Sequence, residues 1–376
     1  MSVDFSTRWV QAQVHTGLVS HNVAIIAQRV APATVWAVVK ANGYGHGSIE
    51  VANAALRAGA TGLCVAIVDE GVALRRAGIG APILVLSEQP PELADFIVGY
   101  QLTPTITTTM GAAAIGAASQ RAGRQVPVHI KVDTGMHRVG VNPREALGLA
   151  RYIASFGSLE IEGVYTHLAV ADQPGHEAND RQLRVFDGVV SELAEHGIRP
   201  PLVHAANSAA ALTNPSARHS MVRVGIAVYG LSPGPNVADA CEGLIPAMSL
   251  KARVSAVRWI EAGEAVSYGL RRRVESQTLI ATVPIGYADG VRRGLTDAGV
   301  PVLINGVPRR LAGTVTMDQI MVDCGTDSAV SVGDEVVLIG RQGDHVVTAD
   351  AWAEALGTIG YEIVCGIGPR VHRVYQ

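Results

Sequence analysis

The sequence predicts an α/β protein, in which a (β/α)8 barrel of the TIM type is followed by a second, mostly β-strand domain. Short apolar runs rich in β-branched residues recur through the first two-thirds of the chain, and Ala-rich, helix-prone stretches separate most of them. Strands that alternate with helices indicate βα units and a parallel sheet buried on both faces. After about Leu244 the pattern changes to alternating apolar and polar residues, which is typical of half-buried strands.

Eight apolar runs supply the expected barrel strands. They are Thr34–Val39, Gly62–Val65, Pro82–Leu86, Leu102–Ile106, Val126–Val132, Ile161–His167, Leu202–His204 and Met221–Val224. The helix-prone stretches include Ile49–Ala58, Asp69–Ala77 and Asn179–His196. Eight such units within about 190 residues match a (β/α)8 barrel, although ~250 residues are typical of that fold. A doubly wound open sheet is the alternative, but its usual GxGxxG signature is absent from the sequence.

The second domain is expected to begin with one strand over Leu250–Ile260. Asn305-Gly306 is a strong hairpin signal, because both turn residues tolerate positive φ. The remaining strands are expected at Leu279–Val283, Pro301–Ile304, Val307–Leu311, Gln319–Asp323, Glu335–Ile339 and Val371–Tyr375. No helix is predicted between Arg8–Val14 and the first barrel strand, so this segment is expected to pair with the β domain. We place the barrel domain at residues 10–244 and the β domain at residues 1–9 plus 245–376.

The composition indicates a globular protein and excludes several classes. The chain has 376 residues, of which 48% are hydrophobic and 17% charged, so it can bury a sizeable core. The net charge of −3 gives no basis for a nucleic-acid or membrane partner. The sequence has no signal-peptide pattern and no apolar run of the ~20 residues that span a bilayer. The four cysteines lack CxxC spacing, so neither a zinc site nor a disulfide framework is expected. Together these features lead us to expect a cytoplasmic protein.

Polar residues at the ends of the expected barrel strands are candidates for an active site, because the carboxyl ends of the strands face it in such barrels. In chain order these residues are Lys40, Arg138, His167, Asn207, Ser208, Arg223, Gly225 and Ile226. A phosphate site is frequent in the loops after strands seven and eight, where Ser208 and Gly225 lie. A lysine at the mouth together with a phosphate site at the rim suggests a pyridoxal phosphate aldimine.

Single residues of this set also have an ordinary structural interpretation. A lysine at a strand end is commonly a solvated surface group, and His167 alone is more typical of a core histidine. The glycines that follow Lys40, within Ala41–Gly47, favour the functional interpretation, because they permit close backbone approach to a ligand. None of the 12 histidines shows HxH or HExxH spacing, so no metal site is expected.

A set of short motifs extends over nearly the whole chain. The first is Ala37-Val-Val-Lys-Ala-Asn-Gly-Tyr-Gly-His-Gly47. The others are Lys131–Gly140, Tyr165–His167, Ala206–Ser208, Val222–Gly230, Val266–Gly269, Ile285–Gly290, Thr316–Gln319 and Tyr361-Glu362. In residue type and in order, these motifs resemble those of the alanine racemase family. The resemblance implies a homodimeric, pyridoxal-phosphate-dependent enzyme that interconverts L-alanine and D-alanine and supplies D-alanine for peptidoglycan.

The resemblance also implies a role for each matching residue. Lys40 would form the internal aldimine and act as one base, and Tyr268 of the other subunit would act as the second base. The residues that would bind the cofactor are Lys40, Tyr44, His167, Asn207, Ser208, Arg223, Gly225, Ile226 and Tyr361. Those that would bind the substrate or gate its entrance are Arg138, Tyr287, Met317 and Asp318. Lys131 matches a lysine that is carbamylated in many members, although an ordinary structural lysine is the equal alternative.

These roles agree with the chemistry of racemisation. Two bases on opposite sides of the cofactor can remove the α-proton from one face and return a proton to the other. A tyrosine that acts near neutral pH needs a pKa shift of up to ~3 units, or ~4 kcal/mol. A hydrogen-bond chain from Tyr268 through His167 to Arg223 would supply part of this shift. An arginine at the pyridine nitrogen does not donate a full proton, which limits the electron sink.

Three other functions are weighed against alanine racemisation. A non-catalytic barrel that binds pyridoxal phosphate would keep Lys40 but would need neither Tyr268 nor the Thr316–Gln319 motif. A decarboxylase of related fold would use a reactive C-terminal cysteine, and Cys365 follows an apolar run that indicates burial instead. A racemase for serine or for a broader set of amino acids stays open, because a hydrophobic pocket rejects an added hydroxyl by only ~100-fold. Thr316, Gln11, Gln13 and Gly360 depart from the commonest family pattern, and none of them removes a group needed for chemistry.

Overall fold

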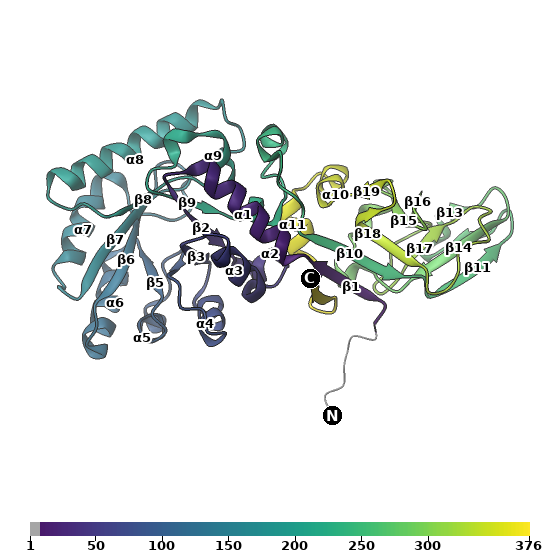
Figure 1. Cartoon of the computed structure of the whole chain (residues 1–376), viewed down its shortest axis with the longest axis horizontal. Coiled ribbons are helices and arrows are strands. Elements are labelled where there is room, and N and C mark those ends of the chain that lie inside the picture. The colour runs from purple at the N-terminus through teal and green to yellow at the C-terminus, as the bar shows by residue number, and fades with distance from the viewer. Residues whose placement is uncertain (1–7) are drawn as a thin grey trace. The chain divides into compact units, whose positions relative to one another are not determined.

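The computed structural model describes residues 8–376, which form two compact units (Figure 1). The first unit comprises Gly17–Gly43 and Ser48–Ile245. The second comprises residues 8–16, Tyr44–Gly47 and Pro246–Gln376. The chain therefore crosses between the units not only near residue 245 but also in the short loop after Lys40.

The first unit is the predicted barrel. Among residues 8–376, eight strands form one parallel sheet in the order β8-β7-β6-β5-β4-β3-β2-β9. Their bounds are β2 (Thr34–Val38), β3 (Gly62–Val65), β4 (Ile83–Val85), β5 (Thr103–Ile106), β6 (Val126–Lys131), β7 (Leu159–Tyr165), β8 (Leu202–His204) and β9 (Met221–Val224). Each strand coincides with one of the eight apolar runs, so the prediction of a (β/α)8 barrel is confirmed.

Main-chain hydrogen bonds bring the two ends of this sheet together. The N–H of Arg223 in β9 donates to the C=O of Ala206 at 3.0 Å, and the N–H of Ser220 donates to the C=O of Val203 at 3.1 Å. The sheet is therefore a nearly closed barrel. Its interior is apolar over much of its length, but it also encloses several polar side chains, including His129, His204 and Arg223.

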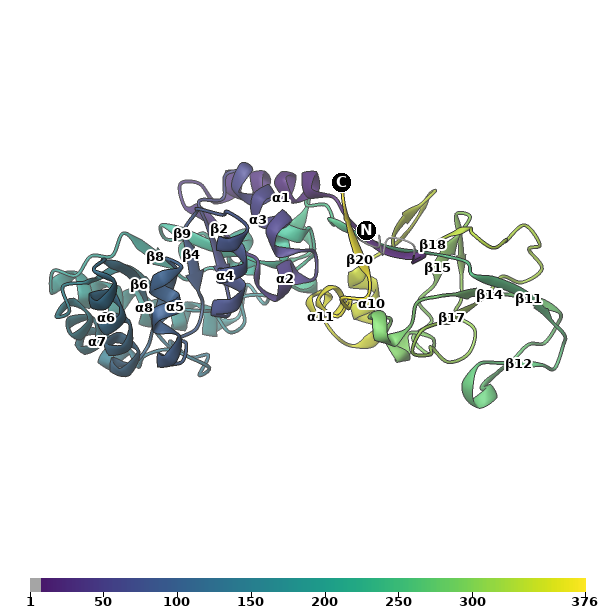
Figure 2. The ribbon, with the colours of Figure 1, turned by 90° about the horizontal axis from the view of Figure 1, so that it is seen from below.

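Helices of this unit lie around the outside of the strands (Figures 1 and 2). They are α1 (Thr16–Val30), α3 (Ser48–Arg57), α4 (Val68–Arg76), α5 (Ala94–Gly99), α6 (Thr109–Ala122), α7 (Ala146–Ala154), α8 (Glu177–Glu195) and α9 (Ser208–Thr213). A further short segment, α2 (Lys40–Tyr44), follows β2. The interpretation of 8–33 as helix-free was wrong, because α1 precedes the first barrel strand. Its buried face consists of Val19, Asn22, Val23, Ile26 and Val30, at helical spacing.

Strand β1 (Val10–Val14) belongs to the second unit, as its expected pairing requires. It lies antiparallel to β10 (Met248–Arg253) and parallel to β20 (His372–Tyr375). The predicted domain bounds placed residues 10–16 with the barrel, whereas these hydrogen bonds place them with the second unit. The correction follows from the alternating burial of β1, whose Val10, Ala12 and Val14 face the core of that unit.

The second unit is built from three small sheets and two helices, within the described residues. The largest sheet runs β16-β15-β18-β10-β1-β20, with β19 paired to β18; the others are β11-β14-β17 and β12-β13. The bounds of its other strands are β11 (Ala256–Ile260), β12 (Ala265–Val266), β13 (Arg272–Arg273), β14 (Thr278–Val283), β15 (Val302–Ile304), β16 (Val307–Arg309), β17 (Ile320–Asp323), β18 (Glu335–Gln342) and β19 (His345–Val347). The helices are α10 (Ala349–Leu356) and α11 (Gly360–Cys365). The predicted second, mostly β domain is therefore confirmed.

The single strand predicted over Leu250–Ile260 was wrong in one respect, because the chain changes sheets within it. Strand β10 pairs with β1 and β18, whereas β11 pairs with β14. Between them the N–H of Val254 donates to the C=O of Asp334, and the N–H of Ser255 donates to the C=O of Thr282. The alternation of apolar and polar residues continues when a strand changes its neighbouring strand. The sequence pattern therefore could not reveal the break between β10 and β11. The Asn305-Gly306 hairpin is confirmed, with positive φ at both residues.

The glycines after Lys40 serve contacts within the chain itself. Gly45 has a φ of +80°, and a Cβ there would lie 2.2 Å from the carbonyl oxygen of Val364. A Cβ on Gly47 would lie 2.0 Å from the hydroxyl of Tyr375. The Tyr44–Gly47 loop is thus held against the C-terminal elements of the second unit, and a side chain at either glycine would separate them.

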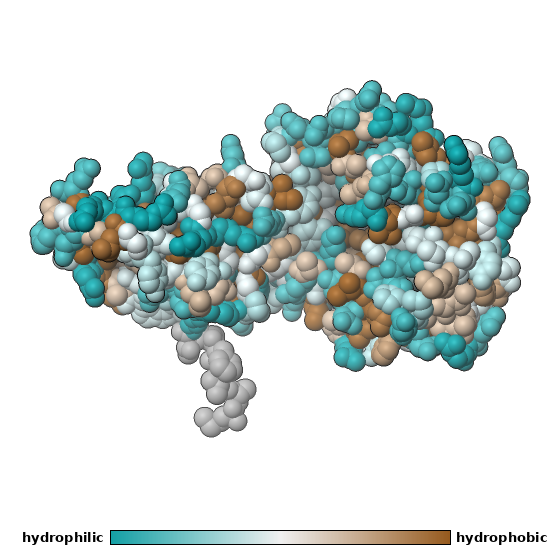
Figure 3. Space-filling model, turned by 180° about the vertical axis from the view of Figure 1, so that it is seen from behind, coloured by the Kyte–Doolittle hydropathy of each residue, from teal (hydrophilic) through white to brown (hydrophobic). Residues whose placement is uncertain are grey.

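The surface mixes hydrophilic residues with scattered hydrophobic ones over the face seen in Figure 3. Within the described part of the chain, none of the helices has both the length and the apolar character that a membrane span requires.

Candidate active site

Five predicted site residues gather at the carboxyl ends of the barrel strands. Lys40 follows β2, Lys131 ends β6, and Arg223 lies in β9. Arg138 and His167 come shortly after β6 and β7. Lys131 and His167 each lie within electrostatic range of the other four. The barrel mouth is therefore strongly cationic, with four basic side chains around one histidine.

The backbone after Lys40 is held in a left-handed conformation. Ala41, Asn42, Gly43 and Tyr44 have φ values of 51°, 52°, 61° and 50°. Such a conformation is unfavourable for residues with a Cβ, and it is usually found where function requires it. Two hydrogen bonds stabilise it: the Ala41 N–H donates to Glu70 Oε1 at 2.6 Å, and the Ser48 N–H donates to Asn42 Oδ1 at 3.1 Å. They fix the direction in which the chain leaves Lys40.

Arg223 is buried inside the barrel and donates hydrogen bonds to neutral acceptors. Its exposed fraction is 3%. Its NH2 group donates to the carbonyl oxygens of Thr166 at 2.8 Å and Ala205 at 3.2 Å. The same nitrogen lies 3.3 Å from Nδ1 of His167, and NH1 lies 2.7 Å from Nδ1 of His204. No carboxylate lies within ion-pair distance of this guanidinium among residues 8–376.

These contacts fix the tautomers of the two histidines. An arginine can only donate, so Nδ1 of His167 and of His204 must accept. Burial, followed by the nearby charge of Arg223, lowers the pKa of both histidines well below the usual range. Each ring is therefore neutral and carries its single proton on Nε2. His167 thus has an N–H to offer on the side away from Arg223.

The ring of Tyr165 packs against both His204 and Arg223. Its ring stacks on that of His204 with centroids 4.6 Å apart, and the guanidinium carbon of Arg223 lies 5.0 Å from its centroid. Its hydroxyl is 2.8 Å from both the carbonyl oxygen of Leu86 and Oγ1 of Thr105. Burial raises the pKa of Tyr165, so this phenol stays protonated and is structural.

The candidate phosphate region lies after β8 and β9. Ser208 begins α9, and its Oγ accepts the N–H of Gly225 at 2.9 Å. Ile226 begins a short 3-10 helix, Ile226–Tyr229. Asn207 caps α9, with its Oδ1 accepting the N–H of Ala210 at 3.1 Å, so this oxygen is already used within the chain. Serine hydroxyl and main-chain N–H groups near helix starts are suitable donors for a phosphate.

Lys131 has an unusual environment for a lysine. It is buried, and its Nζ lies 5.7 Å from the centroid of the Tyr165 ring. Burial, together with the positive charges of Arg138 and Arg223, lowers its pKa to about 8. A minority of this amine is therefore neutral, and nucleophilic, near physiological pH, and this minority is far larger than for an ordinary lysine.

The second unit carries the remaining predicted residues in two places. Tyr268, Tyr287, Met317 and Asp318 line one open pocket of about 780 Å³. Tyr268 is 74% exposed, which is unusual for a large aromatic side chain without a partner surface. Tyr44 and Tyr361 lie together elsewhere, with ring centroids 5.9 Å apart.

An ion network shapes the loop that carries Tyr287. The buried carboxylate of Asp289 accepts two hydrogen bonds of 2.7 Å from Arg8 and pairs with Arg370 at 3.2 Å. Arg370 also donates to Asp318 at 2.7 Å. The N–H groups of Tyr287 and of the next residue donate to the carbonyls of Thr316 and Met317 at 3.0 Å. These bonds place Tyr287 beside the Thr316–Gln319 motif.

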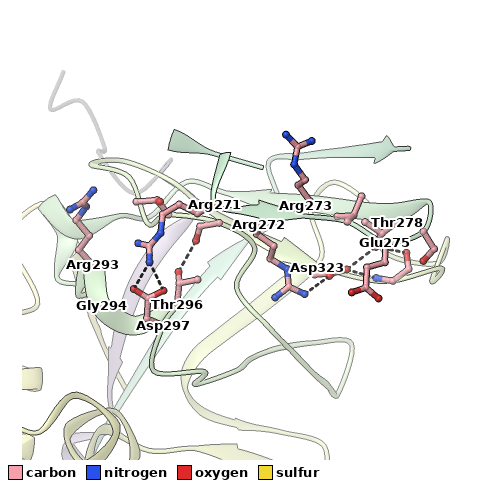
Figure 4. Close-up of a pocket in the computed structure, with 15 residues that line it drawn as sticks. Arg271, Arg272, Arg273, Glu275, Thr278, Arg293, Gly294, Thr296, Asp297 and Asp323 are labelled. Carbon is pink, nitrogen blue, oxygen red and sulfur yellow. Dashed lines mark hydrogen bonds and ion pairs between the residues drawn. The ribbon is translucent and has the colours of Figure 1, made fainter. Parts of the chain in front are cut away.

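A larger depression of about 880 Å³ in the same unit was not anticipated (Figure 4). It is lined by Arg271, Arg272, Arg273 and Arg293, among other residues. Arg271 pairs with Asp297 at 3.3 Å and Arg272 with Asp323 at 3.1 Å (Figure 4). Because carboxylates neutralise two of the arginines, this surface has mixed charge. Over residues 8–376, no group of three histidine, cysteine, aspartate or glutamate side chains is placed to hold a metal ion.

Several residues that shape the site were missed by the sequence analysis. Glu70, His204 and Asp289 are ordinary polar residues in the sequence, and only the fold shows which groups they contact. Tyr165 was noted only as part of a motif. The one available signal was position, since His204 ends a barrel strand and Asp289 lies between glycines in Gly286–Gly290.

Two protein-family models together match nearly the whole chain. Residues 14–233 match "Alanine racemase, N-terminal domain", and residues 247–375 match "Alanine racemase, C-terminal domain". An alanine racemase of Symbiobacterium thermophilum is 47% identical over 364 residues, covering 97% of this chain and 96% of the relative.

The chain also resembles solved structures of two racemases that are named for different amino acids. Alanine racemase of Bacillus anthracis with bound L-Ala-P superposes with a TM-score of 0.92 at 39% identity, covering 98% of this chain and 95% of that one. Histidine racemase of Leuconostoc mesenteroides superposes with a TM-score of 0.92 at 28% identity, covering 99% of each chain. The same architecture thus occurs with more than one amino-acid substrate.

Proposed function

The chain belongs to the alanine racemase family, and from this premise we propose that it interconverts L-alanine and D-alanine with pyridoxal phosphate and two bases, Lys40 and Tyr268. The observation that carries the proposal is the barrel mouth, where Lys40 lies within electrostatic range of a neutral His167 whose Nδ1 contacts the buried Arg223. The product D-alanine would serve peptidoglycan synthesis.

The residues present fit pyridoxal phosphate. The amine of Lys40 suits its aldehyde, and Ser208 with the N–H groups near Gly225 and Ile226 suits a phosphate dianion. We assign Tyr44, Asn207 and Tyr361 to the same end of the cofactor. Arg223 offers a guanidinium without a carboxylate partner in the described chain, and a ring nitrogen is an acceptor that this donor can use. When bound, the cofactor withdraws electrons from an attached amino acid and so makes its Cα–H bond acidic.

The two bases act on opposite faces of the substrate. The Lys40 amine would take the α-proton from one enantiomer, and the Tyr268 hydroxyl would supply a proton to the other face. The roles reverse in the opposite direction. His167 carries its proton on Nε2 and would donate it to the Tyr268 oxygen, while its Nδ1 accepts from Arg223. This hydrogen bond stabilises the tyrosine anion, as a base of that type requires.

Arg138 would bind the substrate carboxylate, with Met317, Asp318 and Tyr287 forming the remaining substrate contacts. We propose that Lys131 positions Arg138 as a carbamate. The neutral amine attacks CO2, a C–N bond forms, and one proton is released, which leaves a negative charge in place of a positive one. The low pKa of Lys131 supplies the neutral amine, and the cationic surroundings stabilise the product.

Tyr268 would come from the partner subunit of a homodimer. Its 74% exposure in the single chain leaves the ring available for another copy, and an isologous contact would complete two identical sites. Alanine is the favoured substrate because the two more similar relatives named above are alanine racemases. A second candidate, racemisation of a larger amino acid, is supported by the histidine racemase with the same architecture.

The first prediction tests the assignment of Lys40. The chain has only three lysines, Lys40, Lys131 and Lys251. Borohydride treatment of the holoenzyme should fix pyridoxal phosphate to the peptide that contains Lys40. Lys40→Ala should lose this attachment and lower the alanine racemisation rate by about 10³-fold or more, as expected for a lost base and nucleophile. Peptide mapping and a chiral amino-acid assay measure both effects.

Lys251→Ala is the matched control, because Lys251 pairs with Glu335 at 3.2 Å in the second unit. It should keep both attachment and activity. Attachment to Lys131 instead of Lys40, or D-alanine formation by Lys40→Ala at the wild-type rate, would contradict the assignment.

The second prediction tests the shared sites. Lys40→Ala and Tyr268→Phe should each be nearly inactive alone. In a mixed dimer one site collects both changes, and the other has an intact Lys40 and an intact Tyr268. Random re-association of equal amounts makes about half of the dimers mixed, so activity should recover to roughly a quarter of wild type. Absence of recovery after demonstrated subunit exchange would place both bases on one chain.

The third prediction concerns Lys131. With 13C-labelled CO2, a carbamate resonance should appear and should grow as pH rises through about 8, because protonated amine does not react. Lys131→Ala should raise KM for alanine roughly 10-fold, about 1.4 kcal/mol, since Arg138 loses its support. A small carboxylic acid should partly restore KM. A wild-type protein without the resonance, together with an unchanged KM in the variant, would show that Lys131 is an ordinary lysine.

A further inference from the structure

A row of three polar side chains extends from Arg223 toward the amino ends of the strands, and the proposed chemistry makes no use of it. NH1 of Arg223 lies 2.7 Å from Nδ1 of His204. Nε2 of His204 lies 2.9 Å from Nδ1 of His129, and Nε2 of His129 lies 3.1 Å from Oε2 of Glu162. The four residues come from β9, β8, β6 and β7 of the same barrel.

The protons in this row can point in only one direction. Arg223 donates, so His204 accepts at Nδ1 and carries its proton on Nε2. That proton is donated to Nδ1 of His129, whose own proton must then lie on Nε2 and point to Glu162. Burial lowers the pKa of both histidines, so neither carries a second proton that would break the order. Every hydrogen bond therefore runs from the guanidinium toward the carboxylate.

The backbone is shaped to bring Glu162 into this row. Strands β6 and β7 shift register between Val128, which pairs with Ile161, and His129, which pairs with Gly163. Glu162 is therefore the extra residue of a β-bulge, and bulges redirect side chains next to active sites. A strand residue in regular alternation with the inward-facing Gly163 would point out of the barrel.

Gly163 makes room for the neighbouring histidine. A Cβ at this position would lie 2.5 Å from the ring of His129. Both the bulge and the glycine are unfavourable in a strand. The bulge brings Glu162 toward His129, and the glycine leaves room for the His129 ring. His129 and His204 are fully buried, whereas the side chain of Glu162 is 27% exposed. The row thus links a buried cation to a carboxylate that water still reaches.

We propose that Glu162 is a positioning residue that acts through His129 and His204 to weaken the hydrogen bond that Arg223 donates to the cofactor ring. The inference rests on the proposed function, which assigns Arg223 to the ring nitrogen. The carboxylate polarises the N–H bond of His129 and makes its Nδ1 a better acceptor. His204 is polarised in the same way, so its Nδ1 accepts a stronger hydrogen bond from Arg223. Arg223 therefore donates a weaker hydrogen bond to the nitrogen of the cofactor ring.

The direction of the effect follows from this polarisation. If the negative charge is removed while an acceptor stays in place, both histidines become poorer acceptors. Arg223 then becomes a stronger donor toward the ring nitrogen. The other charged groups near Arg223 are not substituted in this comparison.

The test uses the holoenzyme loaded with pyridoxal phosphate labelled with 15N in the ring. Glu162→Gln keeps an acceptor oxygen for His129 but removes the charge. Its ring-nitrogen resonance should move toward that of a protonated pyridine, and kcat should change several-fold while KM for alanine stays within about two-fold. Glu160→Gln is the matched control, because it removes the same charge from an exposed position on the same strand.

A second measurement keeps the inference testable if Glu162→Gln folds poorly. In wild-type holoenzyme labelled with 15N in histidine, His129 and His204 should both appear as neutral rings protonated on Nε2. A proton on Nδ1 of either ring would overturn the inference. So would an active Glu162→Gln enzyme with the wild-type ring-nitrogen resonance, or equal shifts in the two glutamine variants. A protein that attaches no pyridoxal phosphate would instead contradict the proposed function, and the histidine tautomers would still test the row.

Discussion

The architecture of the barrel mouth depends on one constraint, the burial of the Arg223 cation. A guanidinium that is 3% exposed needs polar partners, and here they are two main-chain carbonyls and two imidazole nitrogens. This arrangement holds His167 and His204 neutral and fixes their protons on Nε2. It also explains the Tyr165 ring that stacks on His204 beside the guanidinium. The buried charge thus adds to the effect of burial in keeping both histidines neutral.

The same charge gives the mouth its chemical preference. Arg223, Arg138, Lys131 and Lys40 make an electrostatic environment that suits anions, and both a phosphate and an amino-acid carboxylate are anions. Burial, followed by repulsion from Arg138 and Arg223, lowers the pKa of Lys131. The lowered pKa favours the proposed reaction of Lys131 with CO2, because only a neutral amine is nucleophilic. The second unit carries an exposed tyrosine, Tyr268, next to the Thr316–Gln319 motif.

Local sequence patterns predicted the fold well where burial is periodic. All eight barrel strands were found because buried parallel strands read as continuous apolar runs, and the Asn305-Gly306 turn was found by its composition. Helix α1 was missed, and the change of sheet after β10 could not be seen, because alternation does not identify a partner strand. At the site, the motifs predicted Lys40 and Arg223, but not Glu70, His129 or Glu162. Their roles depend on a left-handed turn and a β-bulge, which leave no mark in local composition.

In the proposed reaction two different residues exchange protons with alanine on opposite faces, and isotope incorporation distinguishes this from exchange by a single base. Purified holoenzyme is incubated with L-alanine in D2O. The two enantiomers present early in the reaction are separated by chiral chromatography, and their deuterium content is measured by mass spectrometry. A two-base mechanism predicts D-alanine that carries deuterium at Cα, while the remaining L-alanine largely keeps its original proton, because the donor on the far face equilibrates with solvent. D-alanine that retains the substrate's own proton would indicate a single base that serves both faces. That result, or the absence of D-alanine, would rule out two-base racemisation of alanine by this protein.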